Sequence, residues 1–227
     1  MNQSRKPIVI AIDGTSASGK STTARMVAKK LGFKYVDTGA MYRTLAWYCL
    51  QKKVDTNDPQ KVIEACKRWR TRLVCENDEV RLVVSGYYPE KDIRSAEVSA
   101  VVPRIAAIPA VRDWMKKKQR ECIKFGNLVM EGRDIGSNVF PETEFKFYLD
   151  ASPEERARRR AAQGIPENII ERDRLDSQRA VAPLMIPLGA RVINNSNLTP
   201  EETCEIIVNE VRTRLAQEWA SDTQTQK

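Results

Sequence analysis

Short apolar runs alternate with helical patterns along this chain. The first run, residues 8–12, is rich in β-branched side chains, which is typical of a buried strand. Over residues 24–31 the apolar positions take the spacing of one helical face, and Gly32 follows as a stop signal. The pattern predicts four further short strands, at 35–36, 128–130, 145–149 and 191–193.

These elements predict the class of fold. Strand, helix and strand within about 30 residues make a βαβ unit, whose strands are parallel. Two later helix starts, at 152–155 and 199–202, each combine a cap hydroxyl, a proline and a glutamate three residues on. We therefore predict one α/β domain over residues 1–227, with three layers and a five-stranded parallel sheet.

Between residues 52 and 100 the hydrophobic period changes. Apolar and polar residues alternate over 73–75 and 80–84, on either side of an Asn77-Asp78 turn. This alternation across a turn is a β-hairpin signature. We predict a small antiparallel lobe, at about residues 52–100, inserted into the parallel core.

Composition excludes several kinds of chemistry. The 227 residues include no histidine, which excludes a Ser-His-Asp triad, histidine-ligated zinc and a histidine general base. The five cysteines never stand two or three residues apart, so they form no metal knuckle or redox pair. The first residues lack the apolar core of a signal peptide, and we expect reduced thiols in a cytoplasmic protein.

The charge is basic, with 38 Lys and Arg against 30 Asp and Glu, or +8. Such a balance suits a nucleic acid, a membrane surface or a small polyanion such as a nucleotide. Between residues 154 and 180, seven arginines stand beside six acids, which favours arginine forks over a broad positive face for duplex nucleic acid. No stretch approaches the ~18 consecutive apolar residues of a membrane helix. We expect neither a nucleic acid nor a membrane as partner.

One motif carries specific chemistry. Residues 14–21, GTSASGKS, match the pattern G-x-x-x-x-G-K-S/T between a predicted strand and a predicted helix. The glycines let successive N–H groups and the helix N-terminus point at one anion. Lys20 can reach the β- and γ-phosphates of ATP, and the Ser21 hydroxyl can ligate Mg²⁺. The predicted phosphate-binding residues are Gly14, Thr15, Ser16, Ala17, Ser18, Gly19, Lys20, Ser21 and Thr22.

Arginines recur where ligands of open α/β sheets bind, at the carboxyl ends of the strands. Arg43 lies one turn into the helix after the second strand, and Arg133 follows the third. Each alone could be a solvated charge at a helix start, but two on one edge beside a P-loop favour phosphate binding. Two further groups share helical faces: Arg156, Arg159 and Arg160; and Arg172, Asp176 and Arg179.

Six sequence blocks stand in one order along the chain: IDGTSASGKST, DTGAMYR, IRSAEV at 93–98, PAVR at 109–112, EGRDIGSNVFP at 131–141 and ERDRLDSQRAVAPL at 171–184. In these blocks the chain resembles the bacterial cytidylate kinase family, over about residues 8–215. The resemblance implies transfer of the γ-phosphoryl group of ATP to CMP or dCMP, with Mg²⁺. It also implies that the 52–100 lobe binds the monophosphate and that a short helical lid, about 156–176, carries arginines.

The resemblance further implies roles for individual residues. A carboxylate at the cytosine edge makes chemical sense, because it can accept from the exocyclic amino group. The implied acceptor residues are Arg43, Arg133 and Arg179 at the CMP phosphate, Arg172 and Asp176 at the ribose, Arg112 and Asp134 at the base, and Asp37 and Thr38 beside them. Arg156, Arg159 and Arg160 match the lid arginines that face ATP, and the implied catalytic set is Lys20, Arg133, Arg160 and Arg179.

Two departures from the family and two alternatives bear on this hypothesis. The lid connection, residues 161–170, is shorter than in many members of the family. The family usually reads the base with a serine near position 103, where this chain has Pro103. Base discrimination then rests more on Arg112 and Asp134. The alternatives are the same chemistry on UMP or another small acceptor, and a nucleic-acid-linked P-loop ATPase. The expected partners are ATP, CMP and dCMP, with the chain as a monomer.

Overall fold

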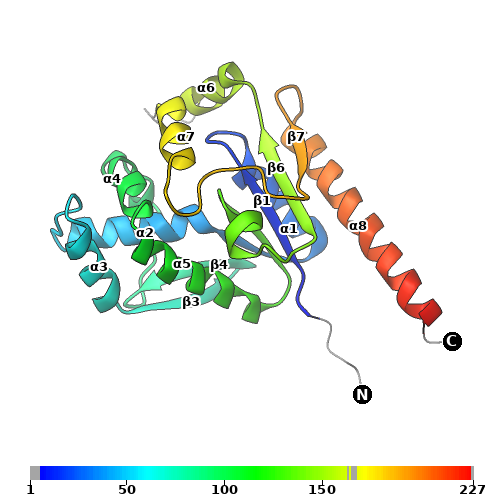
Figure 1. Cartoon of the computed structure of the whole chain (residues 1–227), viewed down its shortest axis with the longest axis horizontal. Helices are drawn as coiled ribbons and strands as arrows, with labels where there is room; N and C mark the ends of the chain where they lie inside the picture. The colour runs from blue at the N-terminus through cyan, green and yellow to red at the C-terminus, as the bar shows by residue number, and fades with distance from the viewer. Residues whose placement is uncertain (1–5, 163, 165–167, 226–227) are drawn as a thin grey trace.

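The structure is a computed structural model that describes residues 6–162, 164 and 168–225 (Figure 1). Residues 163 and 165–167 of the predicted lid lie outside the described residues. So do residues 1–5, on which the expected lack of a signal peptide depends. Within the described part of the chain, no helix combines the length and the apolarity that crossing a membrane requires.

Seven strands form one sheet in the order β3-β4-β2-β5-β1-β6-β7. The strands are β1 (Val9–Gly14), β2 (Lys34–Asp37), β3 (Thr71–Glu76), β4 (Glu79–Val84), β5 (Leu128–Glu131), β6 (Phe145–Asp150) and β7 (Arg191–Asn194). Every neighbouring pair is parallel except β3 and β4. The five predicted parallel strands are therefore confirmed as β1, β2, β5, β6 and β7.

The predicted count of five strands is wrong, because the hairpin belongs to the main sheet. β3 and β4 pair antiparallel around Asn77 and Asp78, whose φ angles are 50° and 62°. β4 also pairs in parallel with β2, with Tyr35 opposite Glu79 and Val36 opposite Val80. The alternating pattern predicted the hairpin but contained no information on which edge it would join.

Helices cover both faces of the sheet. They are α1 (Lys20–Leu31), α2 (Thr38–Gln51), α3 (Pro59–Arg68), α4 (Ala96–Ala106), α5 (Pro109–Glu121), α6 (Pro153–Ala162), α7 (Ile169–Ser177) and α8 (Pro200–Thr225), with short turns η1 (Asp92–Arg94), η2 (Cys122–Phe125) and η3 (Ile135–Val139). Along β1, Val9 and Ala11 pack into the cluster with α2, α4 and α5, whereas Ile10 and Ile12 pack with α1 and α8. This alternation, with β1 buried throughout, makes the three layers.

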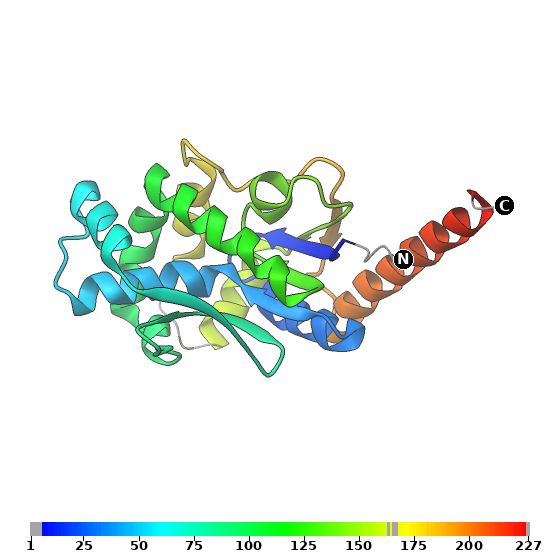
Figure 2. The same ribbon diagram turned by 90° about the horizontal axis from the view of Figure 1, so that it is seen from below.

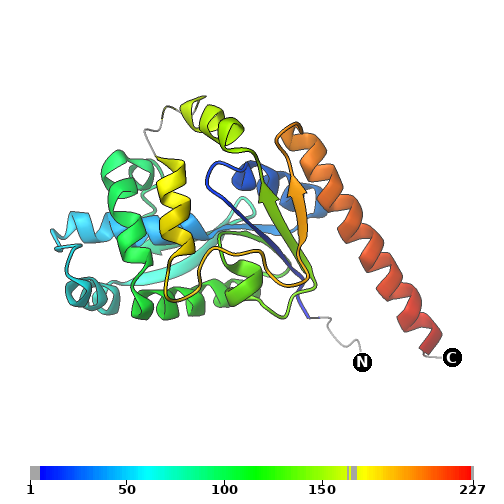
Figure 3. The same cartoon turned by 45° about the horizontal axis from the view of Figure 1, so that its top comes forward.

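The two predicted helix caps, at 152–155 and 199–202, form in the structure and start the helices α6 and α8. The Ser152 hydroxyl accepts from the backbone N–H of Glu155 at 3.2 Å, so α6 starts directly after β6. Thr199 and Glu202 cap α8 reciprocally, at 2.8 and 3.1 Å. α7 packs beside α4 over this edge (Figure 3). The far end of α8 extends away from the rest of the fold (Figure 2).

Candidate active site

The loop between β1 and α1 is shaped by its glycines. Gly14 has a φ of 150°, and a Cβ atom there would lie 2.0 Å from the carbonyl oxygen of Leu149 on β6. Gly19 has a φ of 86° and stands directly before the first residue of α1. Both positions therefore require glycine. The predicted strand, loop and helix context is confirmed, and it leaves the N-terminus of α1 as an anion site.

Lys20 is buried at the start of α1. Its ammonium donates to the carbonyl of Thr15 at 2.5 Å and to the Ser18 hydroxyl at 3.4 Å. Burial, together with the nearby Arg133 guanidinium, lowers the pKa of Lys20 to about 7. Phosphate oxygens at this position would favour the charged ammonium and reverse that shift.

The predicted lid arginines contact the P-loop from α6. Arg156 is buried, and its guanidinium donates to the carbonyl of Ser16 at 3.1 Å and pairs with Asp173. Asp173 in turn accepts from the backbone N–H of Ser16 at 2.8 Å. Arg160 donates to the Ser16 hydroxyl at 3.0 Å. Asp173 is a site residue that sequence reasoning missed, although it stands among the charged residues of the last block.

Asn195, directly after β7, is a second residue that sequence reasoning missed. Its side-chain amide donates to the carbonyl of Ser18 at 2.8 Å. Arg159 donates to the side-chain oxygen of Asn195 at 3.1 Å and to its backbone oxygen at 2.8 Å. No motif marks Asn195, and the available signal was its place after a strand on the ligand edge.

A cleft of about 1010 Å³ opens above this edge. Fifteen of the predicted site residues line it: Ala17, Gly19, Lys20, Ser21, Thr22, Asp37, Thr38, Arg43, Arg112, Arg133, Asp134, Arg159, Arg160, Arg172 and Arg179. The other six support the walls without being among the lining residues: Gly14, Thr15, Ser16, Ser18, Arg156 and Asp176. One cleft thus brings together the P-loop, the lid and the predicted acceptor residues.

Asp176 is the centre of an arginine cluster. Arg133 pairs with its Oδ2 at 3.1 Å, and Arg172 approaches Oδ1 at 3.5 Å. Arg179 also pairs with Oδ1, although it lies just beyond the end of α7. Burial alone would raise the pKa of Asp176, but the three guanidinium groups hold that pKa below its ordinary range. The fully buried carboxylate therefore stays charged and orients the arginines.

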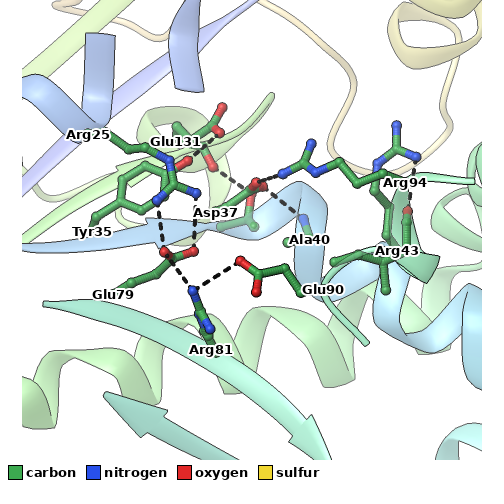
Figure 4. Close-up of polar contacts among 12 residues, drawn as sticks. Arg25, Tyr35, Asp37, Ala40, Arg43, Glu79, Arg81, Glu90, Arg94 and Glu131 are labelled. Carbon is green, nitrogen blue, oxygen red and sulfur yellow. Dashed lines mark hydrogen bonds and ion pairs between the residues drawn. The ribbon is translucent and has the colours of Figure 1, made fainter. Parts of the chain in front are cut away.

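Asp37 and Arg43, at the carboxyl edge of the sheet, contact the segment that was predicted as the inserted lobe, residues 52–100 (Figure 4). Asp37 caps α2 by accepting from the backbone N–H of Ala40 at 2.8 Å, and its other oxygen pairs with Arg94 of η1 at 2.8 Å. Arg43 donates to the Ser99 hydroxyl of α4 at 2.8 Å. Arg94 and Ser99 both line the cleft, and sequence reasoning assigned neither a role.

Arg112 and Asp134 form a buried ion pair, with Nη2 and Oδ2 2.6 Å apart. Arg112 also donates to the carbonyl of Ala106 at 3.1 Å. Its guanidinium carbon lies 5.7 Å from the centre of the Tyr42 ring. The two residues predicted at the base therefore lie together in one wall of the cleft.

Asp13, at the end of β1, supports the turn that follows Asp134. It accepts from the backbone N–H groups of Ile135 and Gly136 at 2.8 and 2.7 Å. Burial raises the pKa of Asp13 to about 7, and the two N–H donors partly offset that rise. Sequence reasoning took Asp13 only as the end of a strand.

Oxygen ligands for a cation lie beside the P-loop. Glu131, at the end of β5, stands opposite Asp37 in the sheet and accepts from the Tyr35 hydroxyl at 3.0 Å (Figure 4). Burial and the Asp37 charge raise the pKa of Glu131, while hydrogen bonds from Ser21 and Tyr35 lower it. Hydroxyl and carboxylate oxygens fit Mg²⁺. Among the described residues, no group of three or more acids, cysteines or histidines is placed to hold a metal ion, so Mg²⁺ would need phosphate oxygens as further ligands.

The fold and the site define the class. A P-loop and a second set of oriented arginines share one cleft at the carboxyl edge of a mostly parallel α/β sheet. Two phosphate sites in one cleft are what phosphoryl transfer between two nucleotides requires. The class is that of the P-loop kinases.

Comparison with known proteins gives the family. The cytidylate kinase family model matches residues 10–213. A cytidylate kinase of Caldanaerobacter subterraneus is 40% identical over 216 residues, which cover 90% of this chain and 95% of that one. Cytidylate kinases of a Geobacillus species and of Bacillus subtilis are 41% and 39% identical, over 93% and 91% of this chain and 99% and 97% of theirs. This chain belongs to the cytidylate kinase family, and it is an ATP-dependent nucleoside-monophosphate kinase.

Proposed function

We propose that this chain transfers the γ-phosphoryl group of ATP to CMP or dCMP by means of the residues described above. The family supplies the reaction, and the assignment of roles to residues rests on the geometry of the cleft. The observation that carries the assignment is the buried Arg112–Asp134 pair in the same cleft as the P-loop and the Asp176 cluster. ADP and CDP or dCDP are the products.

Phosphoryl transfer requires the protein to align the two nucleotides and to stabilise the charge on the transferred group. A phosphate oxygen of CMP forms a bond to the γ-phosphorus of ATP, while the bond from that phosphorus to the bridging oxygen breaks and ADP leaves. The attacking oxygen is already anionic at neutral pH, so the reaction needs no general base. A chain without histidine can therefore catalyse this step by positioning and charge stabilisation alone.

On the ATP side, Lys20 and the P-loop amides bind the phosphates. Arg159 and Arg160 extend from the lid helix into the same cleft, where they can stabilise charge on the transferred group. Lid closure would also exclude water, which otherwise hydrolyses ATP. Ser21, with Glu131 and Asp37 nearby, would hold Mg²⁺ together with the phosphates, and the bound ion would neutralise phosphate charge.

On the acceptor side, Arg43, Arg133 and Arg179 bind the CMP phosphate. Asp176 and Ser99 hold these arginines in place, so little side-chain entropy is lost when the phosphate arrives. Arg172 lies next to them for the ribose hydroxyls, whereas Asp176, which the resemblance also implies at the ribose, is fully buried among the arginines and does not line the cleft. These contacts to phosphate and ribose are common to all nucleotides, so hydrogen bonds to the base must select CMP.

The base is read by Asp134 and Arg112. Cytosine offers an amino group where uracil offers a carbonyl oxygen, and a carboxylate accepts from the first and repels the second. Arg112 can donate to N3 or O2 of cytosine. Because Pro103 has no hydroxyl, this pair carries most of the discrimination.

Replacing Asp134 with asparagine tests the assignment. Asp134→Asn should lower the ratio of kcat/KM for CMP to that for UMP by about tenfold or more, since one base contact is worth roughly 1–3 kcal/mol. Asp113→Asn is the matched control, because Asp113 is exposed on α5. If Asp134→Asn slows both substrates equally, Asp134 serves the phosphates or the cation instead of the base. The cytoplasmic location and the monomeric state stay predictions.

A further inference from the structure

A row of hydrogen bonds runs behind the Arg112–Asp134 pair. The ammonium of Lys116, one turn along α5 from Arg112, donates to the side-chain oxygen of Asn138 at 3.0 Å. The amide nitrogen of Asn138, in η3, donates to Oδ2 of Asp134 at 2.9 Å. Lys116 and Asn138 are half-buried and are not among the residues that line the cleft.

The two neighbours of the Asn138 side chain, the Lys116 ammonium and the Asp134 carboxylate, fix its orientation. An ammonium can only donate, and a charged carboxylate can only accept. The Asn138 amide therefore satisfies both neighbours in one orientation, with its oxygen toward Lys116 and its nitrogen toward Asp134. A flipped amide would lose both hydrogen bonds.

These bonds leave one oxygen of Asp134 unused. Oδ2 accepts from Arg112 and from Asn138. Among the described residues, no hydrogen bond reaches Oδ1. The other terminal nitrogen of Arg112 is bound to the carbonyl of Ala106, and its Nε has no hydrogen-bond partner among the described residues, so Arg112 contacts the carboxylate through Oδ2 alone.

We propose that Asn138, oriented by Lys116, is a positioning residue that fixes the Asp134 carboxylate and keeps Oδ1 available for the amino group of cytosine. This inference rests on the proposed role of Asp134 at the base. Without Asn138, Oδ2 would lose one of its two donors, and the carboxylate could rotate until both oxygens meet Arg112. In that fork both carboxylate oxygens already accept hydrogen bonds from Arg112, so neither is a good acceptor for the amino group of cytosine.

The test replaces Asn138 with leucine, which has a similar size and no hydrogen-bonding group. Asn138→Leu should lower the CMP:UMP ratio of kcat/KM by about 2- to 10-fold, the range for one hydrogen bond, mainly through a higher KM for CMP. The KM for ATP should stay the same. Lys116→Met should give a smaller loss of the same kind, and Lys117→Met, at the exposed neighbouring position, should give none.

A double variant separates this role from a purely structural one. In an Asp134→Asn background, Asn138→Leu should cause no further loss of the CMP:UMP ratio, because the group that it positions is no longer a carboxylate. An equal loss in both backgrounds would overturn the proposal. Thermal unfolding of each variant checks folding, and if Asn138→Leu does not fold, Lys116→Met carries the test.

The remaining outcomes distinguish this proposal from the proposed function. If Asp134→Asn lowers the CMP:UMP ratio but Asn138→Leu and Lys116→Met do not, the positioning role is wrong and Asp134 still reads the base. If Asp134→Asn leaves the ratio unchanged, the base assignment is wrong, and the role of Asn138 is wrong with it.

Discussion

The two ends of the cleft are built differently. The backbone of the ATP end is one continuous segment, residues 14–22, whose conformation depends on two glycines and on the start of α1. Side chains of Arg156, Arg160 and Asn195 contact this segment from α6 and from the end of β7. The acceptor end is assembled from side chains on α2, α5, α7 and the segment after β5, which are separated by many residues in the chain. A phosphate site made from backbone is thus a local property, whereas a nucleotide acceptor site is a property of the tertiary fold.

The electrostatics of the two ends differ in the same way. Within the P-loop itself the charged group is Lys20, which donates hydrogen bonds to its own loop and whose pKa burial lowers to about 7. At the acceptor end the arginines are paired with buried carboxylates, Asp134 and Asp176. An arginine that is already paired with a carboxylate has a fixed orientation before the substrate binds. The Lys20 ammonium has no carboxylate partner in its loop, and its main role is to bind the phosphates. Variants at the two ends should therefore change different kinetic constants, kcat at the ATP end and the KM for CMP at the acceptor end.

The largest effect is expected at the ATP end. Lys20→Ala should lower kcat by at least roughly 10²-fold, comparable to removing one preorganised donor to the transition state. The fold should persist, because the ammonium contacts only its own loop. Steady-state kinetics with circular dichroism would check both points, with Lys117→Ala as the control. Activity above a tenth of wild type would contradict the catalytic role of Lys20.

The next effect is expected at the acceptor end. Arg179→Ala should raise the KM for CMP by about ten- to a hundredfold, because a charge-assisted hydrogen bond is worth roughly 1.5–3 kcal/mol. The KM for ATP should change little. The control is Arg174→Ala, since Arg174 lies on the exposed face of α7 and pairs with Glu171. An equal loss for ATP and CMP would mean that the two ends are not separate.

The third effect concerns stability without nucleotides. Folding lowers the pKa of Lys20 to about 7, against about 10.4 in an unfolded chain. Unfolding therefore takes up a proton between these values, and stability should rise with pH in that window, by at most about 1.4 kcal/mol per pH unit. Lys20→Met should remove this contribution. Urea unfolding at pH 7 and pH 9 measures it, and identical pH dependence in both proteins would show that burial does not shift Lys20.

The contrast between the two ends also explains what the sequence could predict. The P-loop, α1 and its stop at Gly32 depend on residues close together in the chain, and they were predicted correctly. The hairpin was predicted from its alternation, but its attachment to β2 depends on a pairing 44 residues away, Tyr35 with Glu79. No local pattern records such a partner.

The same limit applies to the site residues. Arg133 could be named from its position after a strand, whereas the helical face expected for Arg179 does not form, because α7 ends at Ser177. Their shared partner Asp176 was expected at the ribose hydroxyls, and nothing in the sequence marked it as the buried centre of three arginines. Asp13, Asn195 and Glu131 were missed because what marks them is burial beside the P-loop, and burial becomes visible only once the chain is folded.

The most direct test of the account is a coupled assay of ADP release across acceptors. ATP alone should be consumed at a negligible rate, and CMP and dCMP should be used with a kcat/KM about tenfold or more above that of UMP, as one base contact predicts. AMP, GMP and shikimate should support little turnover. Release of ADP at the same rate without any acceptor, or equal use of CMP and UMP, would contradict a cleft in which the Arg112–Asp134 pair selects the nucleotide.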